Sequence, residues 1–201
     1  MENQEYTFFA SISRMKYIAR WALMRNSREE TLSEHSLEVA MIAHALCTIA
    51  NIRYGASLDA DRAALIGLYH DAAEIITGDM PTPVKYFSEE IRDAYRGVEQ
   101  AAEERLLGQL PGDLRPVYAA IFHGEDTTED RHLRRLVKAA DKISAYIKCI
   151  EEEKAGNTEF RTARETIRAA VRRMEEEDPE VGDFVRESLG AYGKTLDELS
   201  G

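Results

Sequence analysis

The chain has 201 residues, of which 44% are hydrophobic and 31% charged, and its formal net charge is -11 at pH 7. This composition is typical of a soluble globular protein, and the length is sufficient to bury a core without disulfides or a structural metal. The negative charge argues against a protein that binds a nucleic-acid polymer, because such binding needs a concentrated basic surface. A few local Arg or Lys residues can still bind one small phosphate.

We expect a cytoplasmic protein without a membrane partner. The N-terminal sequence lacks the basic segment followed by an apolar segment that a secretory signal has. No stretch approaches the roughly 18 consecutive apolar residues of a membrane span.

The two cysteines, Cys47 and Cys149, lie in apolar helical patterns without metal-ligand spacing, so we expect two buried free thiols.

The hydrophobic pattern is helical almost throughout, which predicts an all-α fold. Apolar residues at three- and four-residue steps predict a first helix from Thr7 to about Ala19, followed directly by Arg20 and Trp21. We find no alternating strand pattern longer than a few residues, no tandem repeat and no low-complexity linker.

A second helix is predicted over about 33–49, because Thr31 and Glu34 have the spacing of a capping box. On this helix His35 shares an apolar line with Val39, whereas His44 falls on the opposite side. The two histidines are therefore not expected to serve one site.

A third helix is predicted over about 60–77, where Gly78 ends it. Pro81 and Pro83 stand too close together for a helix, so DMPTPVKYF is predicted to be an ordered polar loop. Periodic apolar residues predict further helices over about 88–109, 114–122, 133–154 and 160–174, followed by a weaker helical tail.

Three polar residues, His70, Asp71 and Glu74, follow an apolar helical run. Burying them without partners would cost roughly 1–3 kcal/mol for each unsatisfied group, and more for a charge. Residues three and four apart project over neighbouring parts of one helix surface, so the three side chains could lie around the same cation. Taken alone, a His-Asp pair in a helix is more often a surface pair or a hydrogen-bonded core histidine than a metal site.

His35 and Asp141 are two further polar residues in apolar surroundings. Alone, His35 could be a satisfied core residue, and Asp141 could form a helix-surface salt bridge with a neighbouring lysine. Together with His70 and Asp71 they supply two imidazoles and two carboxylates, a set suited to Mn²⁺, Co²⁺, Zn²⁺ or Fe²⁺. The sequence therefore indicates one divalent transition metal, which would compensate the buried carboxylates.

The order His35, His70-Asp71 and Asp141 on a helical chain resembles the HD-domain superfamily of metal-dependent phosphohydrolases. The similarity is closer still to its small bacterial 5'-deoxynucleotidases, which act on deoxyribonucleoside 5'-monophosphates. It is carried by the stretches SRMKYIARWALMRN, SEHSLEVAMIAHAL, LYHDAAEIITGDMPTPVKYF and LVKAADKISAYIKCIEE. The resemblance implies a single HD-domain helical bundle over residues 1–201, with the metal and catalytic core at about 13–152 and C-terminal helices at about 158–198.

The resemblance also implies roles for individual residues, and a homodimer. One metal ion would be held by His35, His70, Asp71 and Asp141. Glu74 would be the catalytic carboxylate, and Arg20 would orient the phosphate for catalysis. The implied substrate-binding residues are Arg20, Trp21, His35, Asp71, Asp79, Met80, Pro81, Thr82 and Asp141.

These residue types suit the hydrolysis of a phosphate ester. A divalent metal can lower the pKa of bound water to about 7 and neutralise phosphate oxygens. Glu74 could move a proton, which typically contributes about 10²–10⁴ in rate. Arg20 offers planar bidentate donors for a phosphate, and Trp21 could pack against the sugar and leave no room for a 2'-hydroxyl.

Three alternatives stay open at the level of sequence. The same metal site could serve a phosphodiesterase or a nucleoside triphosphohydrolase. The domain could be a nucleotide-binding sensor without catalysis, although such a sensor would be expected to lack a ligand or Glu74. A dinuclear site could recruit His123, but it would need more histidines at suitable positions. The motifs and the family resemblance favour a metal-dependent 5'-deoxynucleotidase over these alternatives. Its products would be a deoxyribonucleoside and phosphate.

Overall fold

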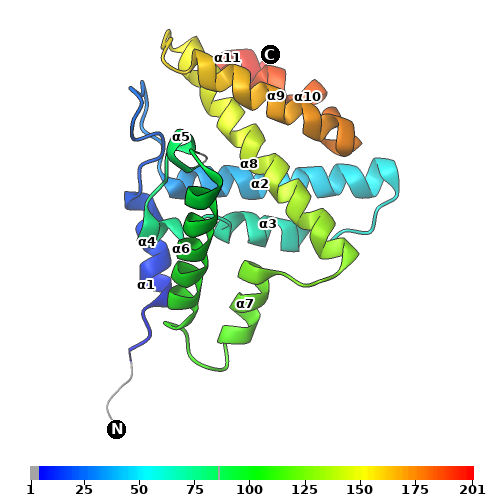
Figure 1. Ribbon diagram of the computed structural model, residues 1–201. Coiled ribbons are helices and arrows are strands. Elements are labelled where there is room, and N and C mark those ends of the chain that lie inside the picture. Colours follow the sequence, from blue (N-terminus) through cyan, green and yellow to red (C-terminus); the bar gives the residue numbers. More distant parts are fainter. Residues whose placement is uncertain (1–4, 86) are drawn as a thin grey trace. The chain divides into compact units, whose positions relative to one another are not determined.

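The computed structural model describes residues 5–85 and 87–201, and the regular elements of these residues are helices (Figure 1). Within the same residues the backbone forms no strand, apart from one isolated bridge between Ala19 and Thr31. The all-α prediction is confirmed. The chain divides into two compact units, Met1–Leu23 with Glu29–Ser36 and Tyr69–Glu125, and Met24–Arg28 with Leu37–Leu68 and Asp126–Gly201. That 1–201 acts as a single domain stays a prediction.

The first unit contains α1 (Phe8–Ile12), the 3-10 helix η1 (Ser13–Tyr17), α4 (Glu74–Thr77), α5 (Thr82–Lys85), α6 (Glu89–Leu107) and α7 (Arg115–His123). In Figure 1, α6 lies beside α1 and α4, which it contacts. Phe8, Ala72 and Leu106 are fully buried together in its core, and the rings of Tyr69 and Tyr118 pack against Phe8. This core holds the segment that follows Tyr69 against α1.

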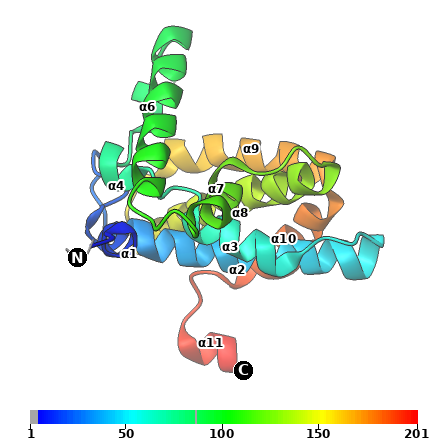
Figure 2. The same cartoon turned by 90° about the horizontal axis from the view of Figure 1, so that it is seen from below.

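The second unit contains most of α2 (Leu32–Tyr54), which begins in the first unit, most of α3 (Ala60–Tyr69), α8 (Thr128–Lys154), α9 (Arg161–Glu177), α10 (Pro179–Ser188), η2 (Leu189–Ala191) and α11 (Leu196–Ser200). Figures 1 and 2 show α9 running along α8, and the two helices are in contact. Gly67 lets α3 approach α2 closely, because a Cβ at this position would lie 2.9 Å from Ala40 Cα.

The first helix is shorter than predicted, so its predicted end is wrong. Instead of continuing to Ala19, α1 ends at Ile12 and the chain tightens into η1 before Ile18 becomes extended. The Arg20 N–H donates to the Glu30 carbonyl at 2.9 Å, and the Leu32 N–H donates to the Ile18 carbonyl at 2.9 Å. These bonds to a distant segment replace the helical ones, which local periodicity cannot indicate.

The third predicted helix is also wrong in extent, because it is interrupted. α3 ends at Tyr69 and α4 begins at Glu74, so His70 and Asp71 occupy a turn between the two helices. Gly78 ends α4 with φ of 74°, as the sequence predicted. Glycine suits this position, since it adopts positive φ at no steric cost.

The segment predicted as a loop contains the short helix α5. Pro83 is its second residue, where the missing N–H would have had no partner within the helix, so both prolines are tolerated here. Tyr86, also part of the predicted loop, lies outside the described residues. The other predicted helices are present with shifted ends: α2 extends to Tyr54, and α8 begins earlier, at Thr128.

α2 is long and apolar enough, by length and composition alone, to cross a membrane. The expectation that no stretch approaches such a span is therefore wrong by this measure. Half of its most apolar 18-residue window is buried inside the protein, however, and Val39, Ile42 and Leu46 are at most 2% exposed. The core helix of a soluble protein has the same character.

The cysteines are as the sequence predicted. Cys47 on α2 and Cys149 on α8 are both fully buried free thiols. Burial raises the pKa of the Cys47 thiol to about 12, with smaller contributions from Glu180 and Asp59, so this thiol is unreactive at neutral pH.

A buried ion pair fixes the loop before α2 in the second unit. The Glu152 carboxylate accepts from Lys148 Nζ, from the Ser27 backbone N–H at 2.8 Å and from Asn157 Nδ2 at 2.7 Å. Burial alone would raise the pKa of Glu152, but the Lys148 and Ser27 donors dominate and lower it from 4.5 to about 2. Glu152 therefore stays ionised and connects residues 24–28 to α8.

We predict that Glu152→Ala lowers the free energy of unfolding at pH 7 by about 3–5 kcal/mol, because it leaves the Lys148 charge buried without its partner. Since folding lowers this pKa, the stabilisation is complete above the ordinary value of 4.5 and is lost as the pH falls towards 2. Urea unfolding at pH 7 and pH 3 measures both effects. The exposed Glu151→Ala is the matched control, and an equal loss in both variants at pH 7 would contradict the prediction.

Candidate active site

His35 lies in the first turn of α2, where a capping box fixes the start of the helix. The Thr31 N–H donates to Glu34 Oε2 at 2.8 Å and the Glu34 N–H donates to Thr31 Oγ1 at 3.3 Å, as the sequence predicted. The His35 side chain is completely buried. The cap therefore determines where this imidazole enters the interior.

Asp71 lies between two imidazoles in the first unit. Its Oδ2 is 2.9 Å from His70 Nε2 and 3.6 Å from His35 Nε2, and the centres of the two imidazole rings are 5.2 Å apart. The ligand atoms that these three residues offer all lie within 4.8 Å of one another. The turn between α3 and α4 thus brings together three of the four residues expected to hold a metal.

The charge of Asp71 suits a metal ligand. Burial alone would raise its pKa, but the His70 and His35 imidazoles outweigh burial and hold the pKa well below its usual range. Asp71 is therefore a carboxylate at neutral pH, which is the form that binds cations. Two imidazoles and one ionised carboxylate form a donor set that fits a divalent transition metal.

Glu74 is the buried carboxyl group next to this cluster. It is 9% exposed, and its Oε2 has no hydrogen-bond partner among the described residues. Burial, followed by the nearby Asp71 and Asp79 carboxylates, raises the pKa of Glu74 from 4.5 to about 9. Glu74 is therefore protonated at neutral pH in the metal-free protein, and its orphaned oxygen suits a bound water or substrate.

Arg20 and Trp21 are held by one carboxylate, that of Glu30. Glu30 Oε2 accepts from Arg20 Nη1 at 2.6 Å and from Trp21 Nε1 at 3.1 Å. The Arg20 guanidinium carbon lies 5.8 Å from the centre of the Trp21 ring. The planar guanidinium and the indole therefore form one array.

The backbone of Trp21 is strained, with φ of 59°, a left-handed conformation that bulky residues rarely adopt. Asp79 Oδ2 accepts the Trp21 backbone N–H at 3.0 Å and so stabilises it. Met80 and Pro81 beside Asp79 are half-buried, and Thr82, the first residue of α5, is exposed. The segment after Gly78 is thereby connected to Trp21.

The sequence also singled out Asp141, His44 and His123. Asp141 lies on α8 in the second unit, where its Oδ2 is 2.9 Å from Lys142 Nζ. Its role as a fourth ligand stays a prediction. His44 is at the surface, 3.6 Å from Asp61 Oδ1. His123 on α7 pairs with Glu104 at 3.1 Å, at the surface of the first unit.

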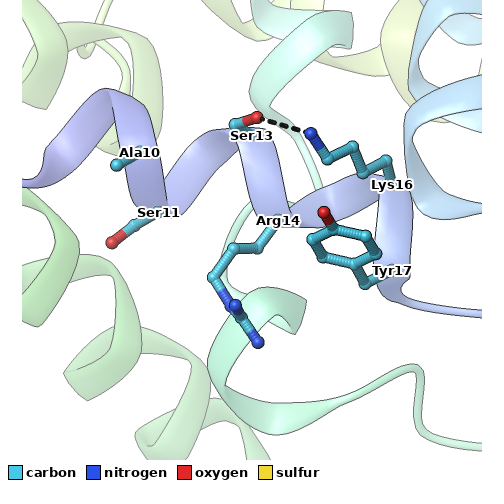
Figure 3. A pocket seen from close by; sticks show the side chains of 6 residues that line it. All are labelled: Ala10, Ser11, Ser13, Arg14, Lys16 and Tyr17. Atoms are coloured by element: carbon cyan, nitrogen blue, oxygen red, sulfur yellow. Dashed lines mark hydrogen bonds between the residues drawn. The ribbon is translucent and has the colours of Figure 1, made fainter.

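A shallow pocket on α1 and η1 is separate from these residues (Figure 3). Its lining includes Arg14 and Lys16, and Lys16 Nζ donates to Ser13 Oγ at 3.3 Å. No imidazole or carboxylate lines it, so it does not suit a cation. None of the predicted site residues contributes to it.

Sequence reasoning missed Glu30. A glutamate in the polar segment NSREE has the appearance of a solvated loop residue, and its spacing from Arg20 follows no helical or strand period. Only the backbone pairing of residues 18–20 with residues 30–32 brings it to Arg20. No local signal in the sequence would have identified it.

Solved structures share this fold. An HD-domain phosphohydrolase from Listeria innocua matches with a TM-score of 0.78 and 24% identity, over 97% of this chain and 89% of that chain. The cyanophage S-2L HD phosphohydrolase DatZ, a structure with bound dA and one catalytic Zn²⁺ ion, matches with a TM-score of 0.59 and 21% identity, over 93% and 96%. The fold is that of the HD-domain phosphohydrolases.

Sequence comparison defines the family. Residues 7–192 match the family described as 5'-deoxynucleotidase YfbR-like. A 5'-deoxynucleotidase of Enterobacter sp. (strain 638) is 45% identical over 195 residues, and the 5'-deoxynucleotidase YfbR of Shigella dysenteriae is 44% identical over 195 residues. Each alignment covers 96% of this chain and 95% of the relative. The chain belongs to the YfbR-like 5'-deoxynucleotidase family, which confirms the resemblance seen in its motifs.

The raised pKa of Glu74 predicts a pH effect on metal-free protein. Folding raises this pKa from 4.5 to about 9, so between these values Glu74 ionises in the unfolded chain but stays protonated in the native state, and the native state loses stability as the pH rises through this interval. The unfolding free energy of chelator-treated wild type should fall relative to that of Glu74→Gln, by at most about 1.4 kcal/mol per pH unit. Urea unfolding of both proteins from pH 5 to pH 9 measures this difference, and parallel curves would refute the prediction.

Proposed function

We propose that this protein is a metal-dependent 5'-deoxynucleotidase, a phosphoric monoester hydrolase that converts deoxyribonucleoside 5'-monophosphates into deoxyribonucleoside and phosphate. The observation that carries the proposal is the cluster of His35, His70 and Asp71 beside the buried Glu74, in a chain of the YfbR-like family. The relatives are named for this activity, and the DatZ structure is bound to dA and one catalytic Zn²⁺ ion.

One divalent transition metal, Co²⁺, Mn²⁺, Zn²⁺ or Fe²⁺, would be held by His35, His70, Asp71 and Asp141. The donor set of the first three residues and the ionised state of Asp71 support this assignment. When bound, a divalent cation acidifies a water molecule and offsets the charge of phosphate oxygens. Buried carboxylates at the site are compensated at the same time, which reduces the penalty of their burial.

Glu74 transfers protons during hydrolysis, from the attacking water and to the departing sugar oxygen. Its high pKa in the metal-free protein means that the carboxyl group is able to hold a proton at neutral pH, and a nearby positive charge would bring that pKa closer to the working pH. In its neutral form Glu74 can donate to the departing sugar oxygen, and in its ionised form it can accept the proton of the attacking water. Groups with a pKa near the working pH perform both steps best.

Arg20 and Trp21 receive the substrate. The Arg20 guanidinium suits bidentate hydrogen bonding to the phosphate, and the Trp21 indole packs against the sugar. Asp79 uses one oxygen for the Trp21 backbone, and the second can accept from the sugar 3'-hydroxyl. Met80, Pro81 and Thr82 complete the substrate loop.

The enzyme acts as a soluble cytoplasmic homodimer. The net charge of -11 is consistent with a small nucleotide as the partner and with neither a nucleic-acid polymer nor a membrane. The homodimer follows from the family resemblance.

The test is phosphate release from matched deoxyribo- and ribonucleoside 5'-monophosphates, with chelator-stripped protein to which Co²⁺, Mn²⁺, Zn²⁺ or Mg²⁺ is returned. We expect metal-dependent release from the deoxy series, with kcat lower by about 10²–10⁴ in Glu74→Ala. The exposed Glu165→Ala on α9 is the control and should match the wild type.

Three outcomes separate the claims of this proposal. Equal rates on both nucleotide series would refute the sugar preference assigned to Trp21, while the phosphatase activity would stand. Release of inorganic triphosphate and deoxyribonucleoside from nucleoside triphosphates, without activity on monophosphates, would replace it with a triphosphohydrolase. No release with any metal would refute the proposed function.

A further inference from the structure

Glu30 is a partly buried carboxylate that the proposed chemistry does not use. Its side chain is 12% exposed, and that of Arg20 is 10% exposed. A single oxygen of Glu30 accepts from both the Arg20 guanidinium and the Trp21 indole. Charge-assisted hydrogen bonds in such sheltered surroundings are stronger than those at the surface, so both donors have a defined position.

The backbone of Glu30 is fixed to the same segment. Its carbonyl accepts the Arg20 N–H at 2.9 Å, next to the bridge between Ala19 and Thr31. Thr31 also caps α2, whose first turn holds His35. A short run of chain in the first unit therefore connects the Arg20–Trp21 pair to the start of the helix that carries a proposed metal ligand.

The conformation of Trp21 needs such support. Its left-handed backbone is unfavourable for a bulky residue and persists only where its surroundings impose it. Asp79 holds the backbone N–H, and Glu30 holds the indole N–H. Two carboxylates from different segments thus fix both ends of this residue.

We infer that Glu30 is a positioning residue that holds the Arg20 guanidinium and the Trp21 indole as one array for the phosphate and the sugar of the substrate. This inference rests on the proposed function. A guanidinium has five N–H donors, more than one carboxylate oxygen can accept, so an Arg20 oriented by Glu30 can also bind phosphate. Because Glu30 fixes the indole, it also contributes to the preference for deoxyribose over ribose.

The test compares Glu30→Ala and Glu30→Gln with the wild type. Glu29→Gln is the matched control, because Glu29 is the exposed neighbour and the variant loses the same charge. Trp21 is the sole tryptophan, so the tryptophan emission, excited where tyrosine does not absorb, and its quenching by acrylamide report on this residue without any need for activity. The second readout is kcat and KM on paired deoxyribo- and ribonucleotides.

In Glu30→Ala we expect a red-shifted emission, stronger quenching, a kcat/KM on deoxynucleotides lower by about 10- to 100-fold and a smaller ratio of deoxy to ribo rates. Glu30→Gln keeps an oxygen for the indole but no charge for Arg20. Its emission should therefore stay close to that of the wild type, while its KM rises. Glu29→Gln should match the wild type in every readout.

Two results would overturn the inference. Unchanged emission in Glu30→Ala would mean that Glu30 does not hold the indole. Changed emission with unchanged KM, kcat and sugar preference would make the contact purely structural. If the wild type itself released no phosphate, the proposed function would fail separately, and the emission comparison alone would decide whether Glu30 positions Trp21.

Discussion

A carboxylate held between two imidazoles is the interaction on which the site depends. Asp71 lies 2.9 Å from His70 and 3.6 Å from His35, and these imidazoles keep it ionised although burial opposes the charge. Burial, reinforced by the same negative charge, raises the pKa of the neighbouring Glu74 and keeps it protonated. Two carboxyl groups close in sequence thus have opposite protonation states because of their surroundings, a pattern that separates a ligand from a proton carrier.

The backbone provides this geometry by departing from regular helix in two places. The interruption between α3 and α4 puts His70 and Asp71 in a turn, anchored by the fully buried Ala72 in the core around Phe8. The extended pairing after η1 places Arg20 and Trp21 opposite Glu30. Most of the site in the first unit is therefore built where helical hydrogen bonding stops and side chains take over.

Much of this was predictable from sequence, because local rules govern it. The capping box at Thr31 and the buried line of His35 depend on residues three and four apart, and both predictions agree with the structure. The interruption at His70 was missed; the residues on either side, Tyr69 and Ala72, pack against Phe8, which is distant in sequence and gives no local signal. Glu30 was missed for the same reason: its partner Arg20 lies ten residues away through a pairing that no periodicity indicates.

The proposed site for a single cation consists of His35, His70, Asp71 and Asp141. Its most direct test is the metal content of chelator-stripped protein after dialysis against Mn²⁺, Co²⁺ or Zn²⁺, measured by elemental mass spectrometry for the wild type, for Asp71→Asn and for the exposed Asp61→Asn. We expect one cation per chain in the wild type and in Asp61→Asn, and none in a folded Asp71→Asn. No bound metal in the wild type, or equal content in all three proteins, would contradict it.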